Sequence, residues 1–227
     1  MKLTRKQIIN YVNIPIITIC ASIIIGIFFN DVLLGSTTLI FGFLNAYYMA
    51  IGKPSNYIFG ILFSITYALE CYNNGLFGFV IFTILVYTPI QIYGLINWIR
   101  HKSNDAIIMK SLKIWHAIVL TLLLAGASFG LGFLLSLIPG QNLAFLDSSS
   151  QILNLCGLIL IALRFREAWY IWLFNNIIDL IIWIMRLCVG AVNAPMAFIV
   201  SIMYFIMNVI GIVLWIKIEL KQKLSSN

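Results

Sequence analysis

The sequence predicts an all-α protein that crosses a membrane several times. Of its 227 residues, 62% are hydrophobic and only 9% are charged, and the mean hydropathy is +1.03. Soluble domains carry about 25% charged residues, so this composition excludes a water-soluble domain. The apolar residues form eight runs of roughly spanning length, and nearly all basic residues lie at alternate junctions between those runs. Together these observations predict a polytopic helical membrane protein.

A spanning helix needs about 20 apolar residues, within a range of about 17–25. The runs predicted to form such helices are Ile8–Phe29, Leu34–Gly52, Asn56–Tyr72, Leu76–Trp98, Ile114–Leu137, Ser149–Leu163, Trp169–Leu187 and Ala194–Ile218. Short segments rich in Gly, Pro, Asn and Ser separate them and mark turns. The sixth run is the weakest, because it is short and holds Gln151 and Asn154. The first run is expected to stay as a helix, since its apolar stretch is long for a signal peptide and no small-residue cleavage site follows.

The basic residues predict the orientation, because Lys and Arg accumulate in cytoplasmic loops. With a cytoplasmic N-terminus and eight spans, every basic residue except Arg186 falls on the cytoplasmic side. These residues are Lys2, Arg5, Lys6, Lys53, Arg100, Lys102, Lys110, Lys113, Arg164, Arg166, Lys217, Lys221 and Lys223. Both termini are therefore predicted to be cytoplasmic. The outer loops are expected to hold Asp31 and Asp147, and Glu70 is expected to be solvated near the outer end of its helix.

Two segments of the chain repeat one pattern. Tyr87-x3-Gln91-x2-Gly94-x3-Trp98-Ile-Arg100 matches Tyr204-x3-Asn208-x2-Gly211-x3-Trp215-Ile-Lys217. Their shared positions lie on one helix face, because they are spaced by four, three and four residues. Helix packing explains the Gly and the membrane interface explains the Trp and the basic residue, but neither explains the buried amides.

The preceding helices match more loosely. Asn56-Tyr57-Ile-Phe59 can be aligned with Trp169-Tyr170-Ile-Trp172, which places Phe63 and Thr66 at the positions of Asn176 and Asp179. The repeats would then be the second to fourth and the sixth to eighth spans, pointing the same way, with the fifth span between them. Parallel repeats of this kind are a known transporter plan, and the solute site lies near the midplane between the halves.

The seventh run carries a polar ridge. Trp169, Trp172, Asn176 and Asp179 are spaced by three, four and three residues, so they share one helix face. Polar groups at membrane depth persist mainly where they face a cavity, a partner or a solute path. We therefore expect a bound solute beside this ridge. Asn175 points about 100° away on the helix and is expected to pack between helices.

Other classes of function are disfavoured. The four cysteines and two histidines show no metal-ligand spacing, so no metal or cofactor site is predicted. A membrane enzyme would need a His or a carboxylate cluster at the surface, whereas the acidic residues of the spans are single and far apart. A nucleic-acid partner is not expected, because there is no basic domain. A non-transporting scaffold or receptor remains an alternative that the repeat and the polar ridge disfavour.

The motifs resemble those of the Pnu vitamin transporter family, most closely its nicotinamide riboside transporters. The matching segments, which lie between about Leu34 and Lys221, are Lys53-Pro-Ser-Asn56-Tyr57-Ile-Phe59-Gly60, Gln91-x-Tyr93-Gly94-x3-Trp98, Phe145-Leu-Asp147-Ser148 and Trp169-x2-Trp172-x3-Asn176. The resemblance implies a SWEET-like fold of three plus one plus three helices. Residues 1–33 would add an N-terminal helix, 34–101 would form the first three-helix repeat, 102–140 the linker helix, and 141–227 the second repeat with a basic tail.

The resemblance also implies a function. It implies import of nicotinamide riboside across a bacterial inner membrane by facilitated diffusion, with trapping by a cytosolic kinase and a homotrimeric assembly. Thiamine, carried by a sister family, is the alternative solute, because it too has a cationic ring.

The expected solute site follows from the chemistry of such a vitamin. Its predicted residues are Trp172, Asn176, Gln91, Trp169, Asp179, Asn208, Tyr87, Asn56 and Trp183. The indoles would offer ring faces to a cationic ring, the amides would bind a carboxamide or hydroxyls, and Asp179 would balance the charge. The alternatives are interfacial anchoring of the Trp residues, helix–helix hydrogen bonding of the amides and capping by Asn56. For Asp179 they are a neutral, buried carboxyl that donates a hydrogen bond, and pairing with Arg186.

Overall fold

The computed structural model describes residues 13–103, 106–107, 110–191 and 194–225. The first residues of the predicted run Ile8–Phe29 and the basic residues Lys2, Arg5 and Lys6 lie outside the described residues.

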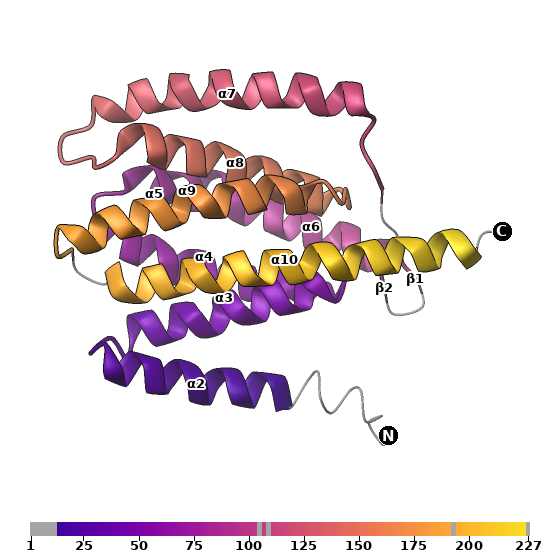
Figure 1. Cartoon of the computed structure of the whole chain (residues 1–227), viewed down its shortest axis with the longest axis horizontal. Coiled ribbons are helices and arrows are strands. Elements are labelled where there is room, and N and C mark those ends of the chain that lie inside the picture. Colours follow the sequence, from indigo (N-terminus) through magenta and orange to yellow (C-terminus); the bar gives the residue numbers. More distant parts are fainter. Residues whose placement is uncertain (1–12, 104–105, 108–109, 192–193, 226–227) are drawn as a thin grey trace.

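The described chain folds into helical rods that run side by side (Figure 1), and each predicted run overlaps one of them. The rods are α2 (Ile14–Phe28), α3 (Leu34–Ala50), α4 (Asn56–Asn73), a composite of α5 (Phe77–Phe82), η2 (Thr83–Tyr87) and α6 (Thr88–Arg100), α7 (Ile114–Ser136), α8 (Ala144–Ala162), α9 (Ala168–Cys188) and α10 (Ala194–Ser225). A hairpin of β1 (Lys102–Ser103) and β2 (Ala106–Ile107) follows α6.

Five helical stretches of the described chain are long and apolar enough to cross a membrane. They are Phe77–Arg100, Ile114–Ser136, Ala144–Ala162, Ala168–Cys188 and Ala194–Leu220. α2 is a shorter apolar helix, and α3 and α4 hold buried polar side chains, among them Asn45 and Glu70. These polar side chains lower the hydropathy of α3 and α4 below that of the five stretches. The architecture is that of a polytopic helical membrane protein, as the sequence predicts.

We call α3, α4 and the α5–η2–α6 rod the first half, and α8, α9 and α10 the second half. α6 packs on α8, and α10 packs on α3, so each half contributes its last helix to the first helix of the other. α2 and α7 lie at opposite edges of the bundle (Figure 1), where α2 packs on α3 and α7 packs on α8. Between α3 and α2, the hydroxyl of Ser36 on α3 donates to the carbonyl of Ser22 on α2 at 2.9 Å.

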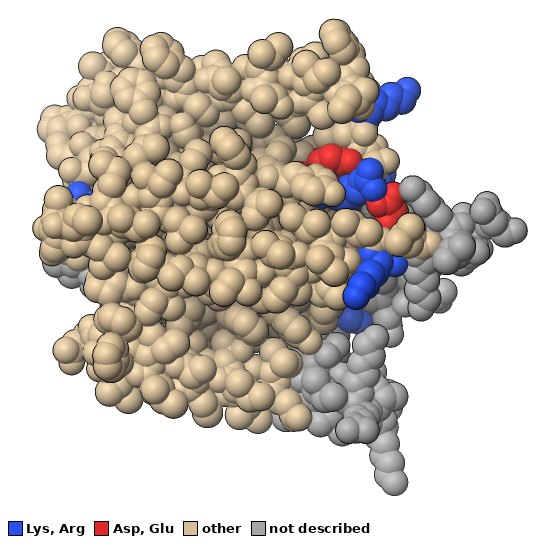
Figure 2. Space-filling view, in the orientation of Figure 1, with Lys and Arg blue, Asp and Glu red and all other residues tan. Residues whose placement is uncertain are grey.

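On the face shown in Figure 2, charged side chains lie at the ends of the rods. Figure 2 shows one face that is almost free of charged side chains, with Lys and Arg gathered at the end where α10 finishes. At that end Lys110 pairs with the α8–α9 turn through its backbone, since its N–H donates to the carbonyl of Arg164 at 2.9 Å. Arg166 there pairs with Glu167 and Glu219. A charge-free band between polar ends is the surface that a bilayer requires.

Two acidic residues expected in solvent are buried instead. Asp147 lies inside α8, which begins at Ala144 and not at Ser149 as predicted. The helix can begin earlier because distant groups satisfy the polar side chains of its first turns: the N–H of Gly78 donates to Asp147 at 3.1 Å, and the hydroxyl of Ser148 donates to the carbonyl of Ser128 at 2.8 Å. Glu70, expected to be solvated, is completely buried, because α3 packs along α4.

Candidate functional site

Two tryptophans join the halves in a reciprocal way. The indole N–H of Trp98 in α6 donates to the carbonyl of Ile161 in α8 at 2.8 Å. The indole N–H of Trp215 in α10 donates to the carbonyl of Met49 in α3 at 3.3 Å. These are the Trp positions of the repeated pattern, so the same motif makes the same kind of contact in each half.

The glycines of the repeated pattern meet aromatic rings in the same manner. A Cβ at Gly94 would lie 2.5 Å from the ring of Tyr57, and a Cβ at Gly211 would lie 2.2 Å from the ring of Trp169. Tyr57 therefore occupies in the first half the place of Trp169 in the second.

The predicted alignment of Asn56 with Trp169 is thus wrong by one residue. One residue turns a helix by about 100°, so the counterparts of Asn176 and Asp179 become Ser64 and Tyr67 in place of Phe63 and Thr66. Ser64 and Tyr67 both line the cavity described next; of the earlier pair, Phe63 lines it and Thr66 does not.

A cavity of about 120 Å³ lies between the two halves. An apolar cavity of about 150 Å³ can hold a benzene ring, so this volume is on the scale of one aromatic ring. All nine residues predicted from the sequence line it, namely Trp172, Asn176, Gln91, Trp169, Asp179, Asn208, Tyr87, Asn56 and Trp183. The ridge of α9 thus faces inward, and the roles of its residues in binding stay predictions.

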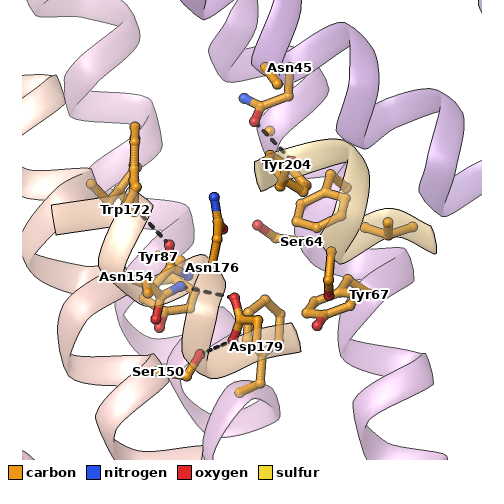
Figure 3. Close-up of a pocket in the computed structure, with 18 of the residues that line it drawn as sticks. Asn45, Ser64, Tyr67, Tyr87, Ser150, Asn154, Trp172, Asn176, Asp179 and Tyr204 are labelled. Carbon is orange, nitrogen blue, oxygen red and sulfur yellow. Dashed lines mark hydrogen bonds between the residues drawn. The ribbon is translucent and has the colours of Figure 1, made fainter. Parts of the chain in front are cut away.

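The ridge is held by neighbours on α8 and α9 (Figure 3). The indole N–H of Trp172 donates to Asn154 at 3.2 Å. The two carboxylate oxygens of Asp179 accept from Ser150 at 2.6 Å and from Asn175 at 3.0 Å. Asn175 was expected to pack away from this face; it lines the cavity, because its amide reaches one turn along α9 to Asp179. Asp179 therefore has its hydrogen bonds from two neutral groups, on Ser150 and Asn175, and does not depend on the alternative partner Arg186.

The predicted residues on other helices have hydrogen-bond partners of different kinds. The amide of Gln91 donates to Ser64 at 3.0 Å, and the hydroxyl of Tyr87 donates to the side chain of Gln151 at 2.6 Å. The amide of Asn56 donates to the carbonyl of Lys53 at 2.7 Å. This bond holds the start of α4 but is not a helix cap, because the side chain donates and α4 has no side-chain cap hydrogen bond. Asn56 also borders the cavity.

Four of the predicted residues present polar atoms that lack a partner. Among the described residues, the indole nitrogen of Trp169, the amide nitrogen of Asn176 and the amide oxygens of Asn56 and Asn208 are buried and make no hydrogen bond. Leaving such an atom unpaired costs about 1–3 kcal/mol, and each case in a folded protein calls for an explanation. All four residues line the same cavity, so a polar solute that pairs with them would explain the arrangement.

Two aromatic clusters bound the cavity along the rods. Toward the basic end lie the rings of Tyr57, Trp98, Trp169 and Trp215, in edge or tilted contacts with centroids 5.3–6.1 Å apart. Toward the opposite end lie Tyr67, Phe79, Tyr87 and Trp183, where the indole of Trp183 donates to the hydroxyl of Tyr67 at 2.7 Å. These rings supply the apolar faces that a planar ring would stack on.

The charged residues of the described cavity lining are acidic. Asp147 and Asp179 belong to it, and within the part of the chain that the structure describes no Lys, Arg or His does. A negatively charged solute group would meet no opposite charge in this cavity. A cationic solute would meet two carboxyl groups.

Sequence reasoning missed several lining residues. They are Asn45, Ser64, Tyr67, Ser150, Gln151, Asn154, Ser201 and Tyr204. The repeated pattern could have identified Tyr204, which is the counterpart of Tyr87 and donates to Asn45 at 3.2 Å. Gln151 and Asn154 are amides in an apolar run, and this is the signal that could have identified them. The serines gave no signal, since Ser is common in packed membrane helices.

A bundle of membrane-spanning helices that encloses a polar, aromatic-lined cavity between two halves has the form of a membrane transporter for a small solute. Residues 32–217 match the model of the family described as nicotinamide mononucleotide transporter. The chain belongs to this family.

Named relatives and a solved structure agree with the assignment. The chain is 27% identical to the nicotinamide riboside transporter PnuC of Neisseria mucosa over 203 residues, which cover 86% of this chain and 76% of that protein. It is 27% identical to the nicotinamide riboside transporter PnuC of Haemophilus influenzae over 174 residues, covering 74% and 72%. The crystal structure of the vitamin B3 transporter PnuC superposes with a TM-score of 0.76 at 24% identity, covering 89% of this chain and 88% of that one, and this likeness concerns the fold.

Proposed function

We propose that this protein imports nicotinamide riboside by facilitated diffusion. The observation that carries the proposal is that buried polar atoms of Trp169, Asn176 and Asn208 in the cavity lining have no partner. Membership of the transporter family and the names of the relatives in Neisseria mucosa and Haemophilus influenzae support the choice of solute.

The cavity chemistry matches the parts of this vitamin. Nicotinamide riboside joins a cationic pyridinium carboxamide to a ribose. Trp172 and Trp183 offer ring faces for a cation–π contact of about 0.5–2 kcal/mol, and Trp169 adds an unpartnered donor. Asn176, Gln91 and Asn208 are amides, which can donate to and accept from the carboxamide and the ribose hydroxyls.

The same lining favours an unphosphorylated solute. The family description names the mononucleotide, but a phosphate group is recognised by Arg, Lys or a helix N-terminus. Because the described lining holds two carboxyl groups and no basic residue, the nucleoside fits and the nucleotide does not. Import would then be driven by phosphorylation in the cytosol, since a kinase product cannot return through this cavity.

The proposed architecture is a duplicated one. Residues 34–101 and 141–227 would be like-oriented three-helix repeats, with the linker helix in 102–140 and an extra helix in 1–33. The reciprocal bonds of Trp98 and Trp215 and the matching ring contacts of Gly94 and Gly211 support it. A SWEET-like arrangement of three plus one plus three helices has these properties.

The proposed setting is a bacterial inner membrane with both termini in the cytoplasm. The gathering of Lys and Arg at one end of the bundle supports this orientation (Figure 2). Assembly as a homotrimer and coupling to a cytosolic kinase are proposed from the family resemblance. The proposal includes no enzymatic step.

Uptake into liposomes tests the function. Purified protein reconstituted without any ion gradient should take up labelled nicotinamide riboside in a saturable way. Trp172→Ala should abolish saturable uptake, because it removes a ring from the cavity wall, whereas Trp115→Ala should retain it, because Trp115 is exposed on α7. Absence of saturable uptake by the unaltered protein would overturn the proposal.

Thiamine is the second candidate, favoured by the acidic lining, since it also carries a cationic ring. Thermal unfolding with each vitamin separates the two. Stabilisation by thiamine alone would replace the solute and keep the class of transporter.

A further inference from the structure

Asp179 holds a carboxylate in the cavity wall with only neutral partners. One oxygen accepts from the hydroxyl of Ser150 and the other from the amide of Asn175. A carboxylate offers about four acceptor positions, so capacity remains after these two bonds. No basic side chain belongs to the described lining, so a negative charge on Asp179 would be balanced only by a bound cation.

The second acid of the lining is used differently. Asp147 accepts three bonds, from the N–H of Gly78, from Gln141 at 2.8 Å and from Gln151 at 3.0 Å. These donors belong to the start of α5, the loop before α8 and α8 itself. Asp147 thus ties three segments together, and Asp179 is the acid left to face a solute.

The polar groups of the cavity are sorted along its length. Figure 3 shows Asp179 beside Tyr67, whereas Asn45 and Tyr204 lie at the far end, with Asn176 and Ser64 between them. The ring of Tyr67 is fixed by the bond from Trp183 and by edge contact with Phe79 at 4.7 Å. A carboxylate next to fixed aromatic faces attracts a cationic ring through both charge and ring quadrupole.

We propose that Asp179 makes the cavity selective for solutes that carry a permanent positive charge on an aromatic ring, and that it discriminates against neutral solutes of the same shape. The proposal rests on the proposed function for its probe, because nicotinamide riboside is such a solute. It adds that the protein distinguishes related solutes by the charge on their aromatic ring and not by their shape.

The unaltered protein provides the first test. Oxidised nicotinamide riboside is cationic, and its 1,4-dihydro form is neutral with almost the same shape. Both are used as unlabelled competitors of labelled nicotinamide riboside uptake in liposomes. The cation should compete at least about tenfold better, which corresponds to about 1.4 kcal/mol. Equal competition would overturn the proposal while leaving the transport function intact.

A matched pair of variants locates the discrimination. Asp179→Asn removes the charge and keeps the size, so the preference for the cation should fall to within about threefold, or about 0.65 kcal/mol. Asp31→Asn makes the same chemical change outside the cavity lining, where Asp31 accepts from the N–H of Gly35, and should keep the full preference. Preference unchanged in Asp179→Asn, with the variant monodisperse, would contradict the proposal; should that variant fail to fold, the comparison of the two solutes on the unaltered protein decides.

A binding assay separates this inference from the proposed function. The probes are 1-methylnicotinamide, a cation, and nicotinamide, its neutral parent. The unaltered protein should be stabilised against thermal unfolding by the cation and not by the neutral compound. This result would support the charge selectivity even if nicotinamide riboside were not transported, and equal stabilisation by both compounds would count against it.

Discussion

Trp98 and Trp215 lie with ring centroids 6.1 Å apart, and each donates its indole N–H to a backbone carbonyl of the opposite half. Both rings are almost completely buried. The pair therefore joins the two halves toward the basic end of the bundle. Because the two bonds are independent of each other, each can be tested alone.

Replacing either Trp by Phe should weaken the contact between the two halves but keep an aromatic ring in place. Trp98→Phe and Trp215→Phe each remove one hydrogen bond and leave the carbonyl with only its backbone donor, the N–H of Arg164 or of Gly52, so each should cost about 0.5–1.5 kcal/mol. For a protein of this size the midpoint of thermal unfolding should fall by about 2–4 °C per kcal/mol. Trp115→Phe on exposed α7 is the control and should leave the midpoint unchanged. A midpoint unaffected in both variants would show that the bonds do not hold the halves together.

The glycines beside these rings give a prediction of the opposite kind, in which atoms are added. Ala at Gly94 or Gly211 would push a methyl group against Tyr57 or Trp169, and such overpacking costs about 1–3 kcal/mol. Both variants should unfold at lower temperature and transport more slowly, because each displaces an aromatic residue of the cavity wall. Gly126→Ala is the matched control, since nothing lies within 4 Å of its Cβ, and it should be neutral or stabilising. Equal behaviour of all three variants would contradict the ring contacts.

Much of the fold follows from the sequence because hydropathy and helical period act locally. Each apolar run became a helical rod, and the ridge from Trp169 to Asp179 faces the cavity because residues spaced by three and four positions share one helix face. The inward direction of the ridge was predictable, since lipid penalises an amide and a carboxylate.

The rest depends on contacts between distant segments, which periodicity does not contain. The contact of Tyr57 with Gly94 sets the rotation of α4 about its own axis. The predicted alignment of α4 with α9 therefore differs from the structure by one residue. The start of α8 is set by the bond from Gly78 to Asp147, 69 positions apart in the sequence. Similarly, Ser150 joins the site only because α8 places it beside Asp179.

Two neighbouring amides on α9 should respond differently to Ala. Asn176 has a buried amide nitrogen without a partner among the described residues, so Asn176→Ala should not lower the unfolding temperature but should weaken vitamin binding about tenfold, or about 1.4 kcal/mol. Asn175 donates to Asp179, so Asn175→Ala should lower stability by about 1–3 kcal/mol by leaving the carboxylate oxygen unpaired. Thermal unfolding with and without nicotinamide riboside measures both effects. A loss of stability in Asn176→Ala equal to that in Asn175→Ala would mean that its amide is a structural group.

The buried acid of α8 should matter for folding more than for selectivity. Asp147→Asn replaces an acceptor oxygen by an amide group that must donate, opposite donors from Gly78, Gln141 and Gln151. At least one donor then loses its partner, which costs about 1–3 kcal/mol and more where the lost acceptor was charged. The midpoint of thermal unfolding should therefore fall further than in Asp31→Asn, whereas the variant that still folds should keep its preference for a cationic over a neutral ring. Loss of that preference in Asp147→Asn, with stability unchanged, would move the charge-selective group from Asp179 to Asp147.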